Sequence, residues 1–169
     1  MNSDLLRFDQ AISAARDTAA VWLALHRLSA AVVGHRLFTV TTIDMDAGLA
    51  RRIYTDHPVE YPLSGSKPIH RDRWFEIVHD ERRSFVANSI AEIAQHFPDH
   101  ELIAALGCGS VINLPVVLKG ELVTTVNMLD RDGSYGPEKV TIAEAILAAP
   151  SKLCFMLAAQ FDLSLQKPD

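Results

Sequence analysis

Two apolar runs separated by a short turn stand out in the hydrophobic pattern of the chain. Ser110–Leu118 and Glu121–Leu129 are rich in β-branched residues and flank Lys119 and Gly120. Glycine readily takes the positive φ that a tight hairpin turn requires, so this pattern predicts two antiparallel strands. Neither run alternates between apolar and polar positions, as a strand with one face in water does. We therefore expect both faces of this hairpin to be covered.

The register of the hairpin decides which of its residues share a face. A turn of two residues places Val116 opposite Val123, and the other face then groups Asn113 with Thr124 in apolar surroundings. We expect the terminal helices to cover the face that carries Leu114 and Val116. Under this register Asn113 and Thr124 face the other way, toward a pocket.

The rest of the chain divides into helical and extended segments. Alternation in a Thr- and Val-rich stretch predicts a second hairpin, Leu37–Asp44 with Leu49–Thr55. Residues 57–69 contain three prolines and are expected to be irregular. Helical spacing and capping residues predict the remaining elements, with a short strand among them: helices near residues 4–15, Thr18–Val33, Trp74–His79, Ile90–His96, His100–Leu106 and Glu138–Phe161, and a strand at Arg83–Ala87.

This order of elements predicts an α+β fold. We expect a central, mostly antiparallel sheet with the N- and C-terminal helices on one face, and residues 57–107, in short helices and loops, have to cover the other face. The last helix is expected to be interrupted or kinked at Pro150. The whole chain, residues 1–169, is interpreted as a single domain with its core at about 18–160, an N-terminal helical arm at 1–17 and a tail at 164–169.

Composition narrows the class of protein. The chain has 169 residues, of which 49% are hydrophobic and 22% charged, so it can bury a substantial core. Its net charge of −5 and the lack of a basic stripe argue against nucleic acid as a partner. The first residues resemble no signal peptide, and no apolar run approaches the ~20 residues of a membrane span, so no membrane association is expected. Two distant cysteines fit a reduced, cytoplasmic protein.

At the level of these segments the sequence resembles the GAF family, small-molecule sensor domains related to PAS. The matching pieces are the strand pair LFTVTTIDMDAGLARRIYTD, the hairpin GCGSVINLPVVLKGELVTTVNMLD and the closing helix. Together they span about residues 18–160. The resemblance implies a six-stranded antiparallel sheet, terminal helices that often build a dimer bundle, and a ligand pocket on the opposite face of the sheet.

The special signatures within this family match only in part. Cyclic-nucleotide-binding members carry an Asn-Lys pair after the hairpin, and here Met128 follows Asn127. Photoreceptor members attach a bilin to a cysteine beside a histidine, a context that Cys108 lacks. One enzymatic branch, free methionine-(R)-sulfoxide reductase, places a key cysteine roughly where Cys108 lies, but its partner cysteines are missing here. No metal, bilin or cyclic nucleotide is specifically indicated, and the cofactor is unknown.

Candidate ligand-binding residues are those expected around the pocket, with ordinary core packing or backbone hydrogen bonds as the alternative for each. The set combines aromatic side chains with the polar pair of the hairpin: Tyr54, Tyr61, Trp74, Phe85, Asn113 and Thr124. Asn127 and Thr125, which share the other face under this register, are a second possible polar pair. Several histidines, His57, His70 and His79 among them, are spread without metal-ligand spacing, so no metal site is expected.

Three functions remain open from the sequence. The first is a stand-alone, non-catalytic module that binds an unknown small molecule, senses it or regulates a partner, and forms a homodimer through its terminal helices. The second is a thiol enzyme of the methionine sulfoxide reductase type using Cys108, although no complete catalytic constellation is present. The third is a dimerisation domain with a collapsed pocket. The apolar residues within Trp22–Val33 and Ile142–Phe161 either dock on the core or form the dimer seam.

Overall fold

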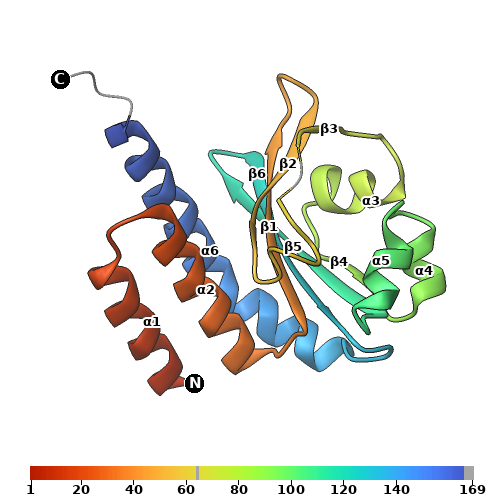
Figure 1. The fold of residues 1–169 in the computed structure, drawn as a ribbon, viewed down its shortest axis with the longest axis horizontal. Helices are drawn as coiled ribbons and strands as arrows, with labels where there is room; N and C mark the ends of the chain where they lie inside the picture. The colour runs from red at the N-terminus through yellow and green to blue at the C-terminus, as the bar shows by residue number, and fades with distance from the viewer. Residues whose placement is uncertain (64, 166–169) are drawn as a thin grey trace.

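A twisted sheet of six antiparallel strands lies between two layers of helices (Figure 1). The computed structural model describes residues 1–63 and 65–165. The strand order is β3-β2-β1-β6-β5-β4. The strands are β1 (Leu37–Asp44), β2 (Leu49–Thr55), β3 (Lys67–Pro68), β4 (Phe85–Ala87), β5 (Ser110–Leu118) and β6 (Glu121–Asp130). The predicted α+β architecture is confirmed.

Three long helices cover one face of this sheet. They are α1 (Asn2–Ala14), α2 (Thr18–Val32) and α6 (Pro137–Leu165), with α1 outermost in Figure 1. The Asp17 carboxylate caps α2 by accepting a hydrogen bond from the backbone N–H of Ala20 at 2.7 Å. Trp22 and Leu25 of α2 and Leu147 of α6 are completely or almost completely buried against Phe38 and other sheet residues. This layer holds the larger of two hydrophobic clusters.

Short helical segments cover the other face. They are α3 (Arg73–Phe75), a π-helical turn η1 (Glu76–Asp80), α4 (Ile90–Ala94) and α5 (His100–Ala105). Val78, Ile93 and Ile103 from these segments join Val111 and Leu129 of the sheet in a second buried cluster. Both faces of the β5–β6 hairpin are therefore covered, as its lack of alternation predicts.

The β5–β6 hairpin has the expected two-residue turn but not the expected register. Lys119 (φ 52°) and Gly120 (φ 81°) form the turn, and Val117 pairs with Leu122. A β-bulge follows, so that Val116 pairs with Thr124 and not with Val123. One extra residue in a strand moves every later side chain to the opposite face. Thr124 therefore lies on the helix-covered face, and the predicted pairing is wrong beyond the bulge.

A second bulge affects the β1–β2 hairpin. Val40 pairs with Tyr54, and the next residue of β1, Thr41, pairs with Arg52, so Ile53 is the extra residue. In a regular strand, residues 52 and 54 would share a face. Here Tyr54 lies on the helix-covered face beside Phe38, and Arg52 lies on the opposite one.

The last helix runs unbroken through Pro150 and extends to Leu165, beyond the predicted end at Phe161. An interruption at Pro150 is thus wrong. Of the expected tail at 164–169, residues 166–169 lie outside the described part of the chain. The stretch Pro137–Asp162 has a window of mean hydropathy 1.6 and is long and apolar enough to cross a membrane by length and composition, contrary to expectation. Its inner side packs on α2 and β5, as in a core helix.

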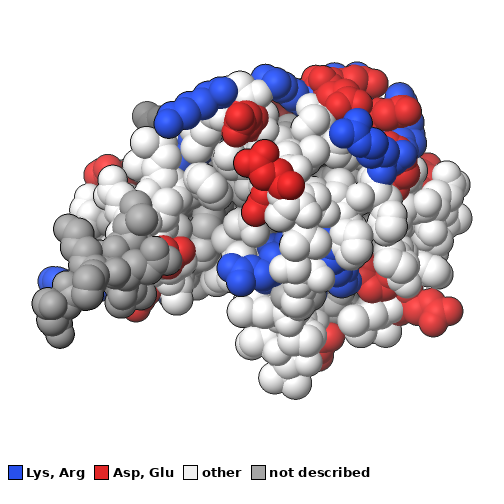
Figure 2. All heavy atoms as spheres, turned by 90° about the horizontal axis from the view of Figure 1, so that it is seen from above, with Lys and Arg blue, Asp and Glu red and all other residues white. Residues whose placement is uncertain are grey.

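Charges on the molecular surface are mixed in sign. Figure 2 shows basic and acidic side chains next to one another on one face, with large uncharged areas between them. Among the surface ion pairs, Arg73 lies 2.9 Å from Glu76, and Arg83 lies 2.6 Å from Glu81. Opposite charges that pair in this way leave no continuous basic stripe on the face shown.

Candidate functional site

A cavity of about 380 Å³ lies between the sheet and the short helical segments. Its floor is formed by polar side chains of the three central strands: Thr39 and Thr41 of β1, Asn113 of β5, and Thr125 and Asn127 of β6. Its walls are mostly apolar and come from α3, α4, α5 and the sheet; Trp74, Ile93, Phe97, Ile103 and Leu129 are among them. A mostly apolar cavity with a few convergent polar groups is the usual form of a small-molecule site.

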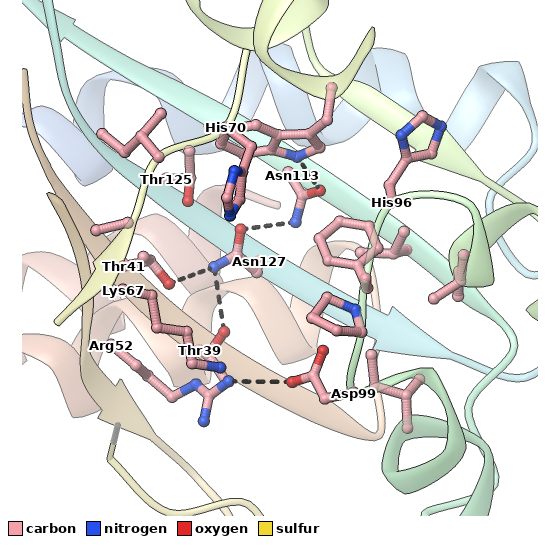
Figure 3. Close-up of a pocket in the computed structure, with 18 of the residues that line it drawn as sticks. Thr39, Thr41, Arg52, Lys67, His70, His96, Asp99, Asn113, Thr125 and Asn127 are labelled. Carbon is pink, nitrogen blue, oxygen red and sulfur yellow. Dashed lines mark hydrogen bonds and ion pairs between the residues drawn. The ribbon is translucent and has the colours of Figure 1, made fainter. Parts of the chain in front are cut away.

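A continuous chain of hydrogen bonds crosses the floor (Figure 3). The indole N–H of Trp74 donates to Oδ1 of Asn113 at 2.9 Å. Nδ2 of Asn113 donates to Oδ1 of Asn127 at 2.7 Å. Nδ2 of Asn127 then donates to the hydroxyl oxygens of Thr39 at 3.1 Å and Thr41 at 3.2 Å. Four strand residues and one helical residue are linked by these bonds.

The indole of Trp74 fixes the direction of the whole chain. An indole N–H can only donate, so the carbonyl oxygen of Asn113 must face it and its amide nitrogen must face Asn127. The same reasoning orients Asn127, whose amide nitrogen faces the two threonines. Because the hydroxyls of Thr39 and Thr41 accept at their oxygens, their hydrogens remain available for an acceptor in the cavity.

Charged side chains gather at one end of the cavity. Figure 3 shows Arg52, Lys67 and Asp99 pointing into the same part of it, near Thr39. The Arg52 guanidinium donates to the Pro62 carbonyl at 2.7 Å, lies 3.6 Å from Asp99, and stacks 3.7 Å over the ring of Tyr61. The side-chain ammonium of Lys67 makes no hydrogen bond or ion pair within the described residues. Arg52 is thus held in place, and Lys67 is free to meet an anionic group.

Tyr61 and His96 also belong to the polar lining, as do His70 and Asp72. The hydroxyl of Tyr61 donates to Asp99 at 2.5 Å, and burial, with Asp99 beside it, raises the pKa of Tyr61 well above its usual range. Tyr61 is therefore a neutral donor. Nδ1 of His96 is buried and finds no hydrogen-bond partner in the described part of the chain; Asp72 lies 4.0 Å away. The His96 ring packs edge-on against Phe85 at the back of the cavity wall.

Three of the six predicted binding residues line this cavity. Tyr61, Trp74 and Asn113 do so. Tyr54 and Thr124 do not, because the two bulges turn them toward the helix layer; the Thr124 hydroxyl donates to the Thr41 carbonyl at 2.7 Å. Phe85 lies behind the wall, with its ring against His96 and Phe97.

Sequence reasoning missed most of the charged and hydroxyl groups of the site. Thr39, Thr41, Arg52, Lys67 and Asp99 come from four separate segments. The alternation of β1, LFTVTTID, carried one usable signal, since its threonines at 39 and 41 share a face by period two. Asn127 was assigned to the face opposite Asn113, which is wrong because of the bulge in β6.

Cys108 lies beside the cavity but does not line it. Its side chain is buried, and burial, with Asp130 adding to it, raises the pKa of the thiol to about 11. Cys154 is buried in the other hydrophobic cluster, where its thiol contacts the Val21 carbonyl at 3.7 Å. Neither thiol has the exposure or the low pKa of a nucleophile.

No family model and no curated protein matches the sequence. Solved structures do match the fold. The GAF domain of a two-component sensor histidine kinase from Bacillus halodurans has a TM-score of 0.64 and 12% identity, with 86% of this chain and 96% of that chain covered.

Two other matches concern the ligands considered above. Free methionine-R-sulfoxide reductase from Neisseria meningitidis, in complex with its substrate, has a TM-score of 0.63 and 13% identity, covering 90% of this chain and 86% of that one. The phycocyanobilin-bound GAF domain of a cyanobacterial phytochrome has a TM-score of 0.65 and 14% identity, covering 98% and 97%. These likenesses establish a common fold.

Proposed function

We propose that this chain, which has the fold of GAF domains, is a non-catalytic module that binds a small organic molecule in the cavity above β1, β5 and β6. One observation carries the proposal. The hydrogen-bond chain from Trp74 through Asn113 and Asn127 ends in the hydroxyls of Thr39 and Thr41. Because these hydroxyl oxygens act as acceptors in the chain, their hydrogens are available to donate to a ligand. A buried amide network aimed at an otherwise apolar cavity provides fixed recognition points for a ligand.

The chemistry of the cavity favours a ligand with an apolar body and a carboxylate. Hydroxyl hydrogens from Thr39 and Thr41 suit an acceptor, and the Lys67 ammonium attracts an anion. The walls formed by Trp74, Ile93 and Phe97 suit an aromatic or branched aliphatic body. A volume of about 380 Å³ accommodates a molecule of metabolite size.

A sensory or regulatory role fits the structural neighbours. The names of two matched structures place one GAF domain in a two-component sensor histidine kinase and another in a cyanobacterial phytochrome. In such a role, ligand binding changes the contacts that the module makes with a partner chain. We further propose that the protein works in the cytoplasm, where its two cysteines remain reduced.

The thiol-enzyme alternative has less support. A reductase needs an accessible thiolate and a second thiol within disulfide reach. Cys108 is buried with a raised pKa, and Cys154 lies in the cluster on the opposite face of the sheet. The open cavity likewise argues against a purely structural domain with a collapsed pocket.

Threonine-to-valine substitutions on the two faces of β1 test the binding proposal. The protein is screened by thermal shift against aromatic and branched aliphatic carboxylates, and inspected by native mass spectrometry for a molecule retained from the cell. We expect at least one carboxylate to raise the melting temperature by a few degrees through mass action. The Thr39→Val/Thr41→Val double variant should abolish this shift. The control Thr42→Val, on the same strand but outside this cavity, should preserve it.

The same experiment defines the contrary result. If the double variant responds to every carboxylate as the wild type does, ligands do not use the hydroxyl end of the cavity, and the proposal is wrong. Turnover of free methionine sulfoxide that disappears in Cys108→Ser would replace the binding module by the thiol enzyme.

We also propose that the module forms a homodimer through its terminal helices. Trp22, a residue expected to contribute, is buried in the core and cannot take part. Apolar side chains nevertheless remain exposed on all three long helices; Leu6 on α1, Leu23 on α2, and Leu153 and Met156 on α6 are 36–58% exposed. Exposed apolar residues gathered on one layer are typical of an interaction surface.

A further inference from the structure

Two histidines and an aspartate meet where the helix layer joins the sheet, on the opposite side of the sheet from the cavity. His26 belongs to α2, His35 to the connection between α2 and β1, and Asp56 directly follows β2. One possible ligand atom from each residue lies within 4.8 Å of those of the other two. We propose that this cluster binds a divalent transition-metal cation, and that Zn²⁺ is the cation its ligands fit best.

His35 presents an unused lone pair. The Ser29 hydroxyl donates to the His26 carbonyl at 2.9 Å, so its oxygen must accept from Nε2–H of His35, also at 2.9 Å. This places the lone pair of the neutral ring on Nδ1. That atom is buried and has no hydrogen-bond partner among the described residues. A buried acceptor without a partner is costly, and a metal ion removes the cost by coordination.

His26 and Asp56 are spaced as two ligands of one metal ion are. Nε2 of His26 lies 3.5 Å from Oδ2 of Asp56, too far for a strong hydrogen bond. Two atoms bound to a tetrahedral Zn²⁺ at about 2.0–2.1 Å lie roughly 3.3 Å apart. The separation of these two atoms is therefore already close to that of two ligands of one Zn²⁺.

The remaining atoms of the cluster hold these ligands in place. Nδ1 of His26 lies 3.2 Å from the Tyr54 hydroxyl, and Oδ1 of Asp56 accepts from the Phe38 backbone N–H at 2.8 Å and from Nδ1 of His57 at 2.9 Å. Metal-ligating histidines and carboxylates usually have such outer partners, which fix their orientation. Tyr54, which sequence reasoning assigned to the cavity, thus has a different role here.

The surroundings of both histidines favour the neutral imidazole. Burial lowers the pKa of His26, and burial together with the neighbouring His26 lowers the pKa of His35 to about 4. Neutral imidazole is the form that coordinates a metal. Two imidazoles and one carboxylate with an open fourth position suit Zn²⁺, whereas Ca²⁺ and Mg²⁺ prefer oxygen ligands throughout.

Metal titration of the full chain tests this site. The tag-free protein is stripped with a chelator, dialysed, and titrated with Zn²⁺ by calorimetry, with elemental analysis for stoichiometry. We expect one Zn²⁺ per chain. Asp56→Asn keeps the shape and the Oδ1 acceptor, and His35→Gln keeps a donor for Ser29; each should weaken Zn²⁺ binding by about 100-fold. His79→Gln, which disrupts a second His–Asp pair (2.7 Å) elsewhere, should bind as the wild type does.

Cobalt provides a readout that does not depend on these variants folding. Co²⁺ added to the stripped wild type should produce the intense visible absorption of a four-coordinate ion, and Zn²⁺ should remove it. Failure of the wild type to bind Zn²⁺, or binding that His79→Gln weakens as much as Asp56→Asn does, would overturn the proposal.

Discussion

Asn127 is the residue on which the polar floor of the cavity depends. It accepts from Asn113 and donates to both Thr39 and Thr41, so all three hydrogen bonds pass through one amide. Replacement by leucine keeps the approximate volume but leaves the Asn113 amide nitrogen buried without that partner. An unsatisfied buried polar group costs about 1–3 kcal/mol. We expect Asn127→Leu to lower the free energy of unfolding by about 2 kcal/mol in urea denaturation.

A neighbouring threonine provides the matched control for this prediction. Thr125 also lies buried on the cavity floor, but it takes no part in the hydrogen-bond chain. Thr125→Val should change the free energy of unfolding by no more than about 0.5 kcal/mol. An equal loss in both variants would mean that the network contributes nothing beyond side-chain packing.

Cys108 is predicted to be a poor nucleophile in the folded protein. Its pKa of about 11, against an ordinary value of 9.0, reduces the thiolate fraction at about pH 8 roughly 100-fold. The raised pKa means that the thiol form is favoured in the native state and that thiolate forms only as the pH rises toward about 11. We expect iodoacetamide to modify Cys108 at least ~100-fold more slowly than an unhindered thiol at about pH 8, with the rate rising with pH. Peptide mass spectrometry measures the modification.

Urea-unfolded protein is the reference for this measurement, since Cys108 and Cys154 should both react there at the rate of an exposed thiol. Rapid modification of Cys108 in the native state near neutral pH would show an accessible thiolate and would favour the enzyme over the binding module.

At the scale of single elements, the β5–β6 turn contains a residue in a costly conformation. Lys119 has a φ of 52°, in the left-handed region that asparagine and glycine tolerate better than lysine. Two-residue hairpin turns of this kind favour Asn-Gly. We expect Lys119→Asn to raise the free energy of unfolding by about 0.5 kcal/mol, measured by urea denaturation.

Gly120 provides the converse variant. A Cβ at this position meets no atom within 4 Å, so Gly120→Ala creates no clash. Its φ of 81° alone should make the variant less stable by about 1 kcal/mol. Unchanged stability in both variants would mean that the turn does not hold its left-handed conformation in solution.

The strands also show how far the sequence determines the fold. Apolar runs, glycine turns and helix caps are local signals, and they identified five of the six strands, the turn at Lys119 and Gly120, and the sandwiching of the sheet. They missed β3, a two-residue strand within residues 57–69, which were expected to be irregular. Bulges are not local signals of that kind. Val123 and Ile53 look like ordinary strand residues, yet each is the extra residue that inverts the face of its neighbours. In a strand that is apolar on both faces, polar and apolar residues do not alternate. A bulge that moves side chains to the opposite face therefore leaves no break in the sequence pattern.

The two bulges also explain why some of the predicted binding residues line the cavity and others do not. Trp74 and Asn113 were placed correctly because neither depends on a register beyond a bulge, whereas Tyr54 and Thr124 both do. Arg52, Lys67 and Asp99 were missed for a different reason. They come from separate segments of the sequence, and only the folded arrangement of these segments around the cavity brings their side chains together.

At the scale of the whole molecule, the sheet separates two chemically distinct regions. On one side is the cavity with its amide chain, and on the other are the helix layer and the His26–His35–Asp56 cluster. β2 belongs to both, since Arg52 points to the cavity and Tyr54 contacts His26 across the strand. A cation bound to the cluster would therefore hold α2 against the strand that carries Arg52, which offers a physical route between the two sites.

The proposed dimer is tested on the outer surface of α6. Only a third of the apolar window within Pro137–Asp162 is buried, and Leu153 and Met156 are 47% and 54% exposed. If a second copy covers them, light scattering at tens of micromolar should report twice the 18.6 kDa of one chain.

Leu153→Glu/Met156→Glu should yield a monomer whose thermal stability is not reduced, because charges at a buried interface oppose association while charges in water do not. Val59→Glu, at a residue that is 84% exposed and lies outside the three long helices, should remain dimeric. A monomeric wild type would assign the exposed apolar side of α6 to a different partner or to a membrane surface, and the addition of lipid vesicles to the same light-scattering sample distinguishes these two.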